Sequence, residues 1–206
     1  MQPEPEGPVL VPFSTPAHQA LLAERRGALR AELGAILRDR TDRFVWEVGC
    51  GHGHFLTAYA QAHPEAVCIG IDIASDRIER ATRKRDRARL PNLHFLQAEA
   101  RLFLETLPIG VGLRDVFILF PDPWPKLRHR KHRILRADFL DAVAGRAARD
   151  CRLCFRTDYA PYFEDAARVV DRHDRWQICD EPWPFEYQTV FQRRAPAYQS
   201  LLARVR

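Results

Sequence analysis

Short, strongly apolar runs alternate along the chain with longer segments in which apolar residues recur at helical spacing. Residues 44–48 (Phe-Val-Trp-Glu-Val) are one of the short runs, which are typical of strands buried on both faces of a parallel sheet. The longer segments predict helices that cover such a sheet. We therefore expect strands at 44–48, 67–71, 93–97, 115–119, 151–157, 176–179 and 189–192, and helices at 17–38, 53–62, 75–90, 99–107, 137–148 and 160–172.

This order of strands and helices predicts an α/β fold with a parallel, doubly wound sheet. Residues 1–16 contain five prolines and few apolar positions. We therefore expect an extended N-terminal arm followed by a single domain over 17–206. Ser75 is the predicted N-cap of the third helix, because a serine hydroxyl there can accept a backbone hydrogen bond.

The composition excludes several classes of protein. Hydrophobic residues make up 46% of the 206 residues, which is typical of a folded globular chain rather than a disordered one. No apolar run approaches the ~20 residues of a membrane-spanning helix, and the acidic, proline-rich first residues do not resemble a signal peptide. The five cysteines are an odd number, so we expect free thiols, a cytoplasmic protein and no bound metal.

A glycine-rich loop follows the first predicted strand. Residues 47–53 read Glu-Val-Gly-Cys-Gly-His-Gly, and Asp72 ends the next strand, 19 residues after Gly53. Glycines allow a sharp turn and leave the backbone open to a ligand. An acid at the position of Asp72 can accept hydrogen bonds from both ribose hydroxyls. The pattern predicts a cofactor that contains a nucleoside.

Glu47 discriminates between two classes of such cofactors. A dinucleotide places its pyrophosphate at a helix N-terminus, usually with the spacing Gly-x-Gly-x-x-Gly. Here the spacing is Gly-x-Gly-x-Gly, and Glu47 stands two residues before Gly49, where its charge would repel a pyrophosphate. A cofactor with an ammonium group and no phosphate suits the loop better, which favours S-adenosylmethionine over NAD. Glu99 could meet the adenine amine, or could instead be an acid at a helix N-terminus.

The most distinctive segment follows the fourth predicted strand. Residues 120–126 read Phe-Pro-Asp-Pro-Trp-Pro-Lys, and residues 126–133 contain five Lys or Arg and two His. Three prolines in five residues exclude a helix or a central strand. A rigid loop should therefore place Asp122 and Trp124 beyond the carboxyl end of a strand, where ligands bind in open α/β sheets. An acid, an aromatic ring and a basic strip at this place predict a negatively charged substrate that contains a ring.

With these segments the chain resembles the bacterial tRNA (guanine-N7)-methyltransferase family. The matching segments are 47–53, 70–72, 120–133, 157–158 and 189–192, in the family's order. The resemblance implies a seven-stranded, Rossmann-like, mostly parallel sheet with helices on both faces and an antiparallel last strand. It also implies transfer of a methyl group from S-adenosylmethionine to N7 of a guanine in the variable loop of tRNA. We expect the protein to act on tRNA as a monomer or a homodimer.

The resemblance also assigns roles to individual residues. Asp122 is the expected catalytic acid, which could follow the positive charge that develops on the base or hold the guanine N1–H and N2–H₂ donors. The N7 lone pair needs no deprotonation, so we expect catalysis to come mostly from orientation of the reactants. The expected cofactor-binding residues are Glu47, Gly49, Gly51, Gly53, Asp72, Ile73, Glu99, Ala100 and Asp122, and the expected substrate-binding residues are Lys126, Arg128, Asp158, Thr189 and Gln192.

Two basic segments receive different interpretations. The cations of 126–133 would contact RNA phosphates, which position RNA without reading its sequence. Within the adjoining loop, Trp124 would stack on a flipped base, anchor the loop, or do both. Residues 77–89 are also strongly basic, but we expect an exposed helix with interleaved acids there.

The chain departs from the family's pattern in two places. Gln192 stands where the family has a glutamate, and a Pro-Glu-Pro-Glu segment replaces the usual Arg- and Gly-rich N-terminal approach. Three alternatives stay open: a methyltransferase with another substrate, a non-catalytic tRNA-binding relative, and a dinucleotide oxidoreductase. Assays of methyl transfer to tRNA and to small acceptors would separate them.

Overall fold

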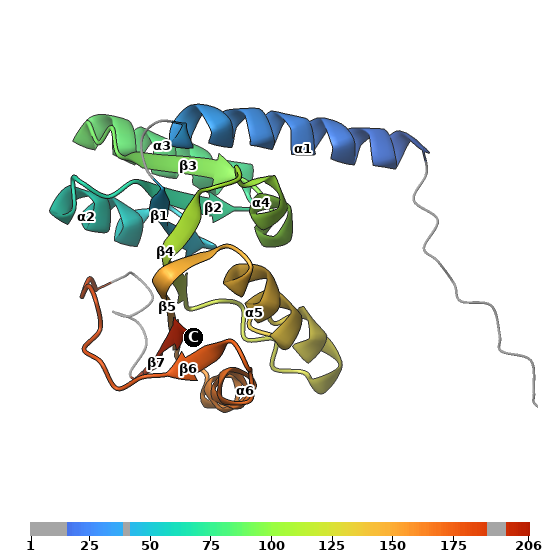
Figure 1. Ribbon diagram of the computed structural model, residues 1–206, viewed down its shortest axis with the longest axis vertical. Coiled ribbons are helices and arrows are strands. Elements are labelled where there is room, and N and C mark those ends of the chain that lie inside the picture. The colour runs from blue at the N-terminus through green and yellow to red at the C-terminus, as the bar shows by residue number, and fades with distance from the viewer. Residues whose placement is uncertain (1–15, 39–41, 189–196) are drawn as a thin grey trace, which may run out of the picture.

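Seven strands form one mixed sheet in the computed structural model, which describes residues 16–38, 42–188 and 197–206 (Figure 1). The strands are β1 (Arg43–Val48), β2 (Cys68–Asp72), β3 (Leu93–Gln97), β4 (Gly112–Leu119), β5 (Ala147–Thr157), β6 (Trp176–Ile178) and β7 (Gln199–Val205). Their order across the sheet is β3-β2-β1-β4-β5-β7-β6. Strands β1 to β5 are parallel, whereas β7 is antiparallel to β5 and β6. The predicted doubly wound sheet with an antiparallel last strand is therefore confirmed.

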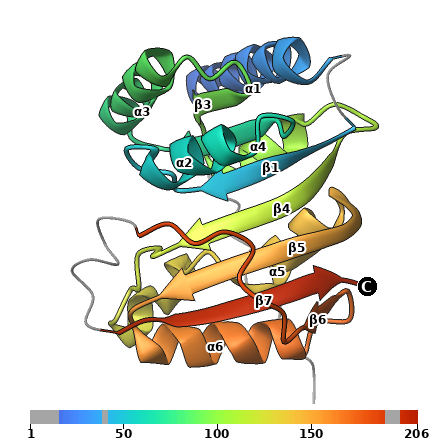
Figure 2. The same cartoon turned by 90° about the vertical axis from the view of Figure 1, so that its left-hand side faces the viewer.

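Helices cover both faces of this sheet (Figure 2). They are α1 (Pro16–Leu37), α2 (His54–Ala62), α3 (Ser75–Ala88), α4 (Ala100–Thr106), α5 (Ala137–Ala144) and α6 (Ala160–Asp171), with a 3₁₀ helix at Leu127–His132. Apolar residues of α2 and α3 form one core with one face of the sheet. Those of α1, α4, α5 and α6 form a second core with the other face.

Strand β1 shows how the sequence builds both cores. All of its residues after Arg43 are buried, and successive side chains of a strand point to opposite faces. Val45 accordingly joins the core under α2, while Trp46 joins the other core. There Trp46 stacks on Phe103 of α4, with ring centroids 4.9 Å apart. This explains why β1 reads as a continuous apolar run instead of an alternating one.

The segment that follows β6 covers a part of the sheet over which none of the described helices lies. It crosses in front of β5 and β4 in Figure 2, and its residues Trp183, Phe185 and Tyr187 pack against the core under α2. The Phe185 ring lies 5.8 Å from Phe55 and 5.2 Å from Tyr59. Three aromatic residues thus replace a helix on this face.

The structure corrects three sequence-based predictions. The helix predicted to reach residue 148 ends at Ala144, because Gly145 caps it and the chain enters β5 at Ala147. Strand β7 at Gln199–Val205 was not predicted, because its run of Gln, Leu, Ala and Arg has the composition of a helix. Ser75 is not an N-cap, since Ala74 occupies that position without a side-chain hydrogen bond.

Two other predictions lie outside the described residues. These are the strand at 189–192 and nearly all of the extended arm at 1–16. At the end of that arm, α1 begins at Pro16.

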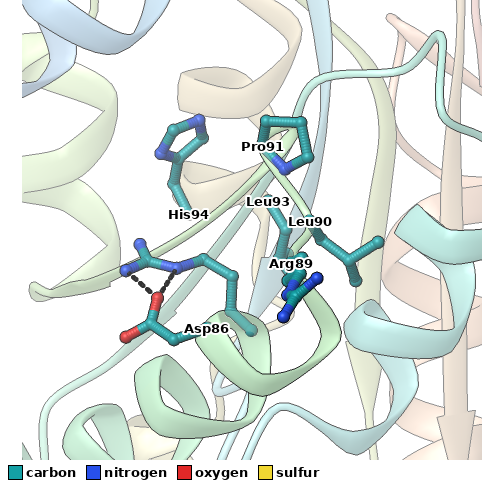
Figure 3. Close-up of a pocket in the computed structure, with 7 residues that line it drawn as sticks. Asp86, Arg89, Leu90, Pro91, Leu93 and His94 are labelled. Atoms are coloured by element: carbon teal, nitrogen blue, oxygen red, sulfur yellow. Dashed lines mark hydrogen bonds and ion pairs between the residues drawn. The ribbon is translucent and has the colours of Figure 1, made fainter.

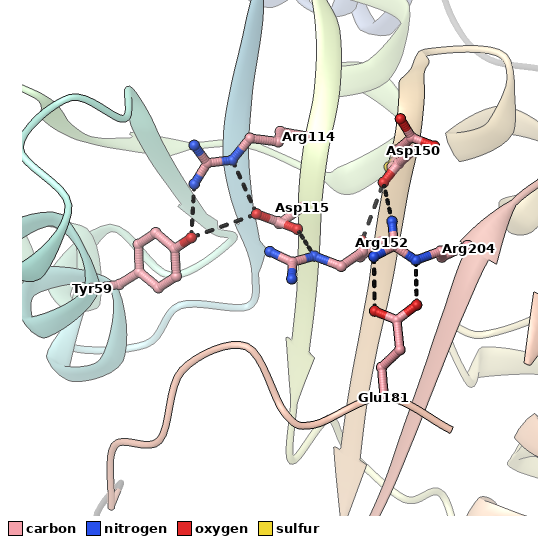
Figure 4. Close-up of polar contacts among 8 residues, drawn as sticks. Tyr59, Arg114, Asp115, Asp150, Arg152, Glu181 and Arg204 are labelled. Carbon is pink, nitrogen blue, oxygen red and sulfur yellow. Dashed lines mark hydrogen bonds and ion pairs between the residues drawn. The ribbon is translucent and has the colours of Figure 1, made fainter. Parts of the chain in front are cut away.

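A buried carboxylate joins β4, β5 and α2 (Figure 4). Asp115 is fully buried. Its carboxylate accepts hydrogen bonds from Arg152 Nε at 2.5 Å and from Arg114 Nε at 3.1 Å. Tyr59 Oη also donates to it at 3.5 Å, and Arg114 Nη2 donates to Tyr59 Oη at 2.8 Å. Nearby, Arg204 of β7 forms a bidentate ion pair with Glu181. The hydrogen bonds from Arg152, Arg114 and Tyr59 compensate the negative charge of Asp115, which would be costly to bury without them.

We expect Asp115→Ala to lower the free energy of unfolding by roughly 3 kcal/mol, because two partly buried arginines would lose their carboxylate. Urea denaturation measures this loss. Glu105→Ala is the control, because it removes an ion pair between Arg26 and Glu105 whose side chains are 48% and 55% exposed. That variant should lose less than about 1 kcal/mol. Equally small losses for both variants would contradict a structural role for Asp115.

Candidate active site

The glycine loop turns sharply between β1 and α2. Gly49, Gly51 and Gly53 have φ angles of 71°, 54° and 67°, in the left-handed region that glycine adopts without strain. A Cβ atom on Gly53 would lie 2.4 Å from Phe95 Cζ, whereas a Cβ on Gly49 or Gly51 would meet nothing within 4 Å. The third glycine is therefore required by packing inside the protein. The first two leave open space at the end of β1.

Glu47, near the end of β1, is buried, and its Oε2 has no hydrogen-bond partner among the described residues. Burial and the nearby negative charge of Asp72 together raise the pKa of Glu47 to about 8, although a hydrogen bond with the backbone of Leu56 and the charge of Lys84 act to lower it. A buried carboxyl oxygen without a hydrogen-bond partner is costly to a protein. A cationic ligand at this position would supply the missing partner.

Asp72, at the end of β2, closes the other side of the glycine loop. Its carboxylate accepts hydrogen bonds from the backbone N–H of Gly51 at 3.0 Å and of Ala74 at 2.9 Å. The Arg77 guanidinium lies 3.5 Å away. A carboxylate has about four acceptor sites, so Asp72 retains capacity for ribose hydroxyls.

Residues after β2 and β3 complete this side of the site. Ile73 is 73% exposed, which is unusual for an isoleucine. Gln97 Nε2 donates to the Ile73 carbonyl at 3.0 Å. Glu99 is the N-cap of α4, because its Oε2 accepts hydrogen bonds from the N–H groups of Arg101 and Leu102. Of the two predicted roles of Glu99, the acid at a helix N-terminus is confirmed. The predicted contacts of Glu99 and of the adjacent Ala100 with adenine stay predictions.

The proline-bounded loop after β4 has an unusual backbone. Phe120 and Trp124 have φ angles of 52° and 45°, which side chains other than glycine rarely adopt and which cost about 1–2 kcal/mol each. The Phe120 N–H donates to the carbonyl of Arg156 in β5 at 2.8 Å. Between the two strained residues, Asp122 is exposed and has no hydrogen-bond or ion-pair partner in the described ranges. The loop presents a free carboxylate on a constrained backbone.

A buried arginine holds this loop in place. Arg133 is 4% exposed, and its Nε donates to the Pro123 carbonyl at 2.9 Å. Its Nη1 donates to Asp165 of α6 at 2.5 Å, and its guanidinium lies 4.6 Å from the centre of the Tyr162 ring. The prediction that all cations of 126–133 contact phosphate is therefore wrong for Arg133. Its charge is already compensated inside the protein.

The other cations of this segment lie along the 3₁₀ helix. Arg130 is partly buried and lies 3.5 Å from Asp165, whereas Lys126, Arg128 and Lys131 are exposed. The ring of Trp124 lies 5.9 Å from His129 and 5.1 Å from His132. Three exposed cations and a cluster of three rings thus stand beside Asp122, and they are named the cationic loop (residues 126–132) below.

The carboxyl end of β5 carries further predicted residues. Asp158 is exposed, and the preceding Thr157 is buried, with its Oγ1 accepting a hydrogen bond from the Tyr159 N–H at 3.2 Å. The predicted substrate residues Thr189 and Gln192 lie outside the described residues.

Sequence reasoning missed Arg156, which is buried at the same strand end. It forms a bidentate ion pair with Glu186 and lies 3.8 Å from the centre of the Trp183 ring. An arginine directly after the apolar residues 153–155 of a predicted strand was the available signal.

A surface depression of about 350 Å³ lies away from these residues (Figure 3). It is lined by Arg89, Leu90 and Pro91 at the end of α3, and by Leu93 and His94 at the start of β3. It therefore stands at the amino edge of the sheet, opposite to the glycine loop.

Two findings concern absences among the described residues. None of their helices combines the length and apolar character needed to cross a bilayer. No group of three or more His, Cys, Asp or Glu side chains among them is arranged to hold a metal ion. All five cysteines are free thiols.

The chain is similar in sequence to proteins of known family. A family model described as "Putative methyltransferase" matches residues 41–196. A tRNA (guanine-N(7)-)-methyltransferase of Magnetococcus marinus is 34% identical over 179 residues, which cover 84% of this chain and 70% of that protein. The chain belongs to the tRNA (guanine-N7)-methyltransferase family. A further member, from Azorhizobium caulinodans, is 32% identical, with 82% of this chain and 79% of that protein covered.

Solved structures show that this family member has the fold of other methyltransferases. The antibiotic-resistance methyltransferase Kmr superposes with a TM-score of 0.55 at 23% identity, covering 86% of this chain and 93% of that one. A variant 16S rRNA (adenine(1408)-N(1))-methyltransferase from Catenulisporales acidiphilia, solved with S-adenosylmethionine, gives a TM-score of 0.56 at 20% identity. That match covers 88% of this chain and 90% of the other. The predicted Rossmann-like fold is confirmed.

We expect Gly53→Ala to destabilise the protein by about 2–4 kcal/mol. The new methyl group would overlap the Phe95 ring, and the alanine would have to adopt a left-handed backbone conformation. Gly51→Ala should cost only about 1–2 kcal/mol, since it adds backbone strain without a clash. Denaturant unfolding of both variants measures the difference. Equal losses would show that packing against Phe95 does not constrain the loop.

We expect Glu47 to make stability depend on pH. Its pKa rises from 4.5 to about 8 on folding, so between these values the folded protein binds more protons than the unfolded chain. The free energy of unfolding should therefore decrease as pH rises through this window, by up to about 4 kcal/mol. The contribution is complete below pH ~4.5 and lost above pH ~8.

Urea denaturation from pH 5 to 9 checks this expectation. Glu47→Gln is the control, because it keeps the shape of the side chain and removes the titration. Identical pH profiles for the wild type and this variant would show that Glu47 does not titrate in this range.

Proposed function

We propose that this protein transfers a methyl group from S-adenosylmethionine to N7 of a guanine in the variable loop of tRNA. The observation that carries the proposal is the juxtaposition of the buried Glu47, whose Oε2 has no hydrogen-bond partner among the described residues, with the exposed Asp122 at the ends of the neighbouring strands β1 and β4. A buried acid that could bind a cation thus lies beside a loop that carries an acid and several cations. Membership in the tRNA (guanine-N7)-methyltransferase family supports the same assignment.

The residues at the ends of β1, β2 and β3 fit the cofactor. Glu47 would bind its ammonium group, and Asp72 would accept hydrogen bonds from the ribose hydroxyls. Ile73 would cover one face of the adenine, near Glu99 and Ala100. The open space at Gly49 and Gly51 leaves room for the ligand next to the backbone. When bound, S-adenosylmethionine supplies an electrophilic methyl group on a positively charged sulfur.

The nucleophile requires no base from the protein. Guanine N7 carries an in-plane lone pair at neutral pH, so attack on the methyl carbon removes no proton from N7. The protein's contribution is then to hold guanine N7 in line with the methyl carbon and the sulfur, and to prevent other orientations of the base. A constrained backbone on both sides of Asp122 suits this task, because the main chain that carries the carboxylate is fixed before the substrate arrives.

Asp122 has two roles open to it at this position. Its carboxylate could stabilise the positive charge that the base acquires on methylation, or it could accept hydrogen bonds from the guanine N1–H and N2–H₂ groups. Its carboxylate has no partner in the part of the chain that the structure describes, which is compatible with either role. Lys126 and Arg128 would contact phosphates, and Asp158, Thr189 and Gln192 would meet the substrate.

Methyl mapping on tRNA tests the proposal directly. Purified protein is incubated with tRNA and labelled S-adenosylmethionine, and the methylated position is identified by nuclease mapping. We expect label at N7 of a variable-loop guanine, and we expect Asp122→Ala to reduce the rate by at least about 100-fold. Asp138→Ala is the control, because Asp138 is an exposed acid of α5 whose carboxylate forms ion pairs with the exposed Arg101 and Arg136.

Three outcomes would contradict the assignment. Wild-type binding of tRNA without methyl transfer would indicate a non-catalytic relative. Transfer to small acceptors alone would indicate another substrate. Full activity of Asp122→Ala would remove Asp122 from the catalytic site.

A further inference from the structure

Positive charge is concentrated in two short segments of this chain. Residues 75–89, which form α3 and its cap, hold seven Lys or Arg and three acids, a net charge of +4. Residues 126–133 hold five Lys or Arg and no acid, a net charge of +5. Since the whole chain carries +5, all other residues together carry −4. The basic character of the protein therefore lies entirely in these two segments, as in proteins that bind polyanions.

Three arginines of α3 form a continuous stripe on its solvent side. Arg80, Arg83 and Arg87 are exposed, and their spacing of three and four residues places them on one face of the helix. None of the three forms an ion pair within the described residues. Asp76 and Glu79 stand four residues before Arg80 and Arg83, but no pair forms at either spacing. This set is called the arginine stripe below.

The stripe differs from the remaining cations of the helix, which have partners. Arg77 lies 3.5 Å from Asp72, and Lys84 Nζ donates to the His52 carbonyl at 2.8 Å. Arg85 donates twice to Asp86. The predicted exposed helix with interleaved acids is present, but among the described residues none of its acids pairs with the arginine stripe.

Helix α3 and the cationic loop lie on opposite sides of the candidate site, and the arginine stripe follows α3 from the carboxyl edge of the sheet toward its amino edge. Helix α3 begins at Ser75, directly beyond the carboxyl end of β2, and the cationic loop follows β4. Strand β1, which carries Glu47, lies between β2 and β4. Helix α3 packs on one face of the sheet, whereas Arg130 of the cationic loop contacts Asp165 of α6 on the other. Figure 2 shows both segments on the side toward which the β1 and β4 arrows point.

We propose that the arginine stripe is a second phosphate-binding surface for tRNA, which contacts the backbone on the side of the target guanine away from the cationic loop. The inference rests on the proposed function. Guanidinium groups bind phosphate oxygens through paired hydrogen bonds, and three unpaired guanidiniums in a row match a polyanion. The stripe has no apolar residue of the kind that anchors a helix in a membrane surface.

Two triple variants with the same change in charge test this inference. The first, R80Q/R83Q/R87Q, removes the arginine stripe while keeping residues that favour a helix. The control, R38Q/R149Q/R172Q, removes three exposed arginines near the amino ends of β1 and β5 and after α6, at the opposite edge of the sheet. The affinity for tRNA is measured at several salt concentrations.

We expect the stripe variant to bind tRNA at least about tenfold more weakly near 0.1 M salt, with a salt slope reduced by about 2, since each phosphate contact contributes about 0.7–0.9. Its KM for tRNA should rise accordingly. The control should stay within about twofold of wild type, because charges far from the contact are screened. The variant R80K/R83K/R87K, which keeps the charge, should retain most of the slope.

The outcomes separate this inference from the proposed function. Equal salt slopes for the stripe variant and the control would overturn the inference while leaving methyl transfer intact. Wild-type protein that binds tRNA but transfers no methyl group would refute the proposed function, and the slopes would still decide the role of the stripe. Thermal denaturation and calorimetry with S-adenosylhomocysteine verify that each variant is folded. If R80Q/R83Q/R87Q does not fold, an unchanged slope in the three single Gln variants overturns the inference.

Discussion

The parallel pairing of β1 with β2 on one side and with β4 on the other determines where the candidate functional residues lie. Parallel strands end at the same edge of a sheet, and the order β3-β2-β1-β4 reverses direction at β1. Loops leaving β1 and β4 turn toward opposite faces at such a reversal, which leaves space between them. Glu47, Asp72 and Asp122, far apart in sequence, are brought to this place by the strand order alone. No loop could create the site without that pairing.

The proposed function requires the same edge of the sheet to accept a cation and a polyanion, and the electrostatics of the acids there are compatible with both. Burial holds Glu47 with a pKa of about 8, so its carboxyl group is mostly protonated near neutral pH while no cation is bound. The carboxylate of Asp72 is compensated by two backbone N–H groups and by Arg77. Glu47 and Asp72 therefore project little negative charge toward an approaching RNA. The exposed cations of the loop after β4 lie on the surface, where phosphates can reach them.

The sequence predicted the parts of the protein that depend on local pattern. Strands with continuous apolar runs, the glycine turn and the proline-bounded loop all follow from neighbouring residues. It did not reveal which arginines are buried, because burial depends on distant partners: Arg133 pairs with Asp165, 32 residues away, and Arg156 with Glu186, 30 residues away. Strand β7 was missed for a similar reason. Its residues favour a helix, and they form a strand because they pair with β5 on one side and with β6 on the other.

The strained loop shows why these buried arginines matter to the chemistry. Two positive φ angles would cost a few kcal/mol together, and a free loop would relax to avoid them. The hydrogen bond from Arg133 to the Pro123 carbonyl and the one from the Phe120 N–H to Arg156 hold the backbone on both sides of Asp122. Because Arg133 is itself bound to Asp165 and packed on Tyr162, helix α6 supports the orientation of Asp122 although it carries none of the predicted site residues. For a reaction that depends on orientation rather than proton transfer, a backbone held in this way fixes where the acid stands relative to the substrate.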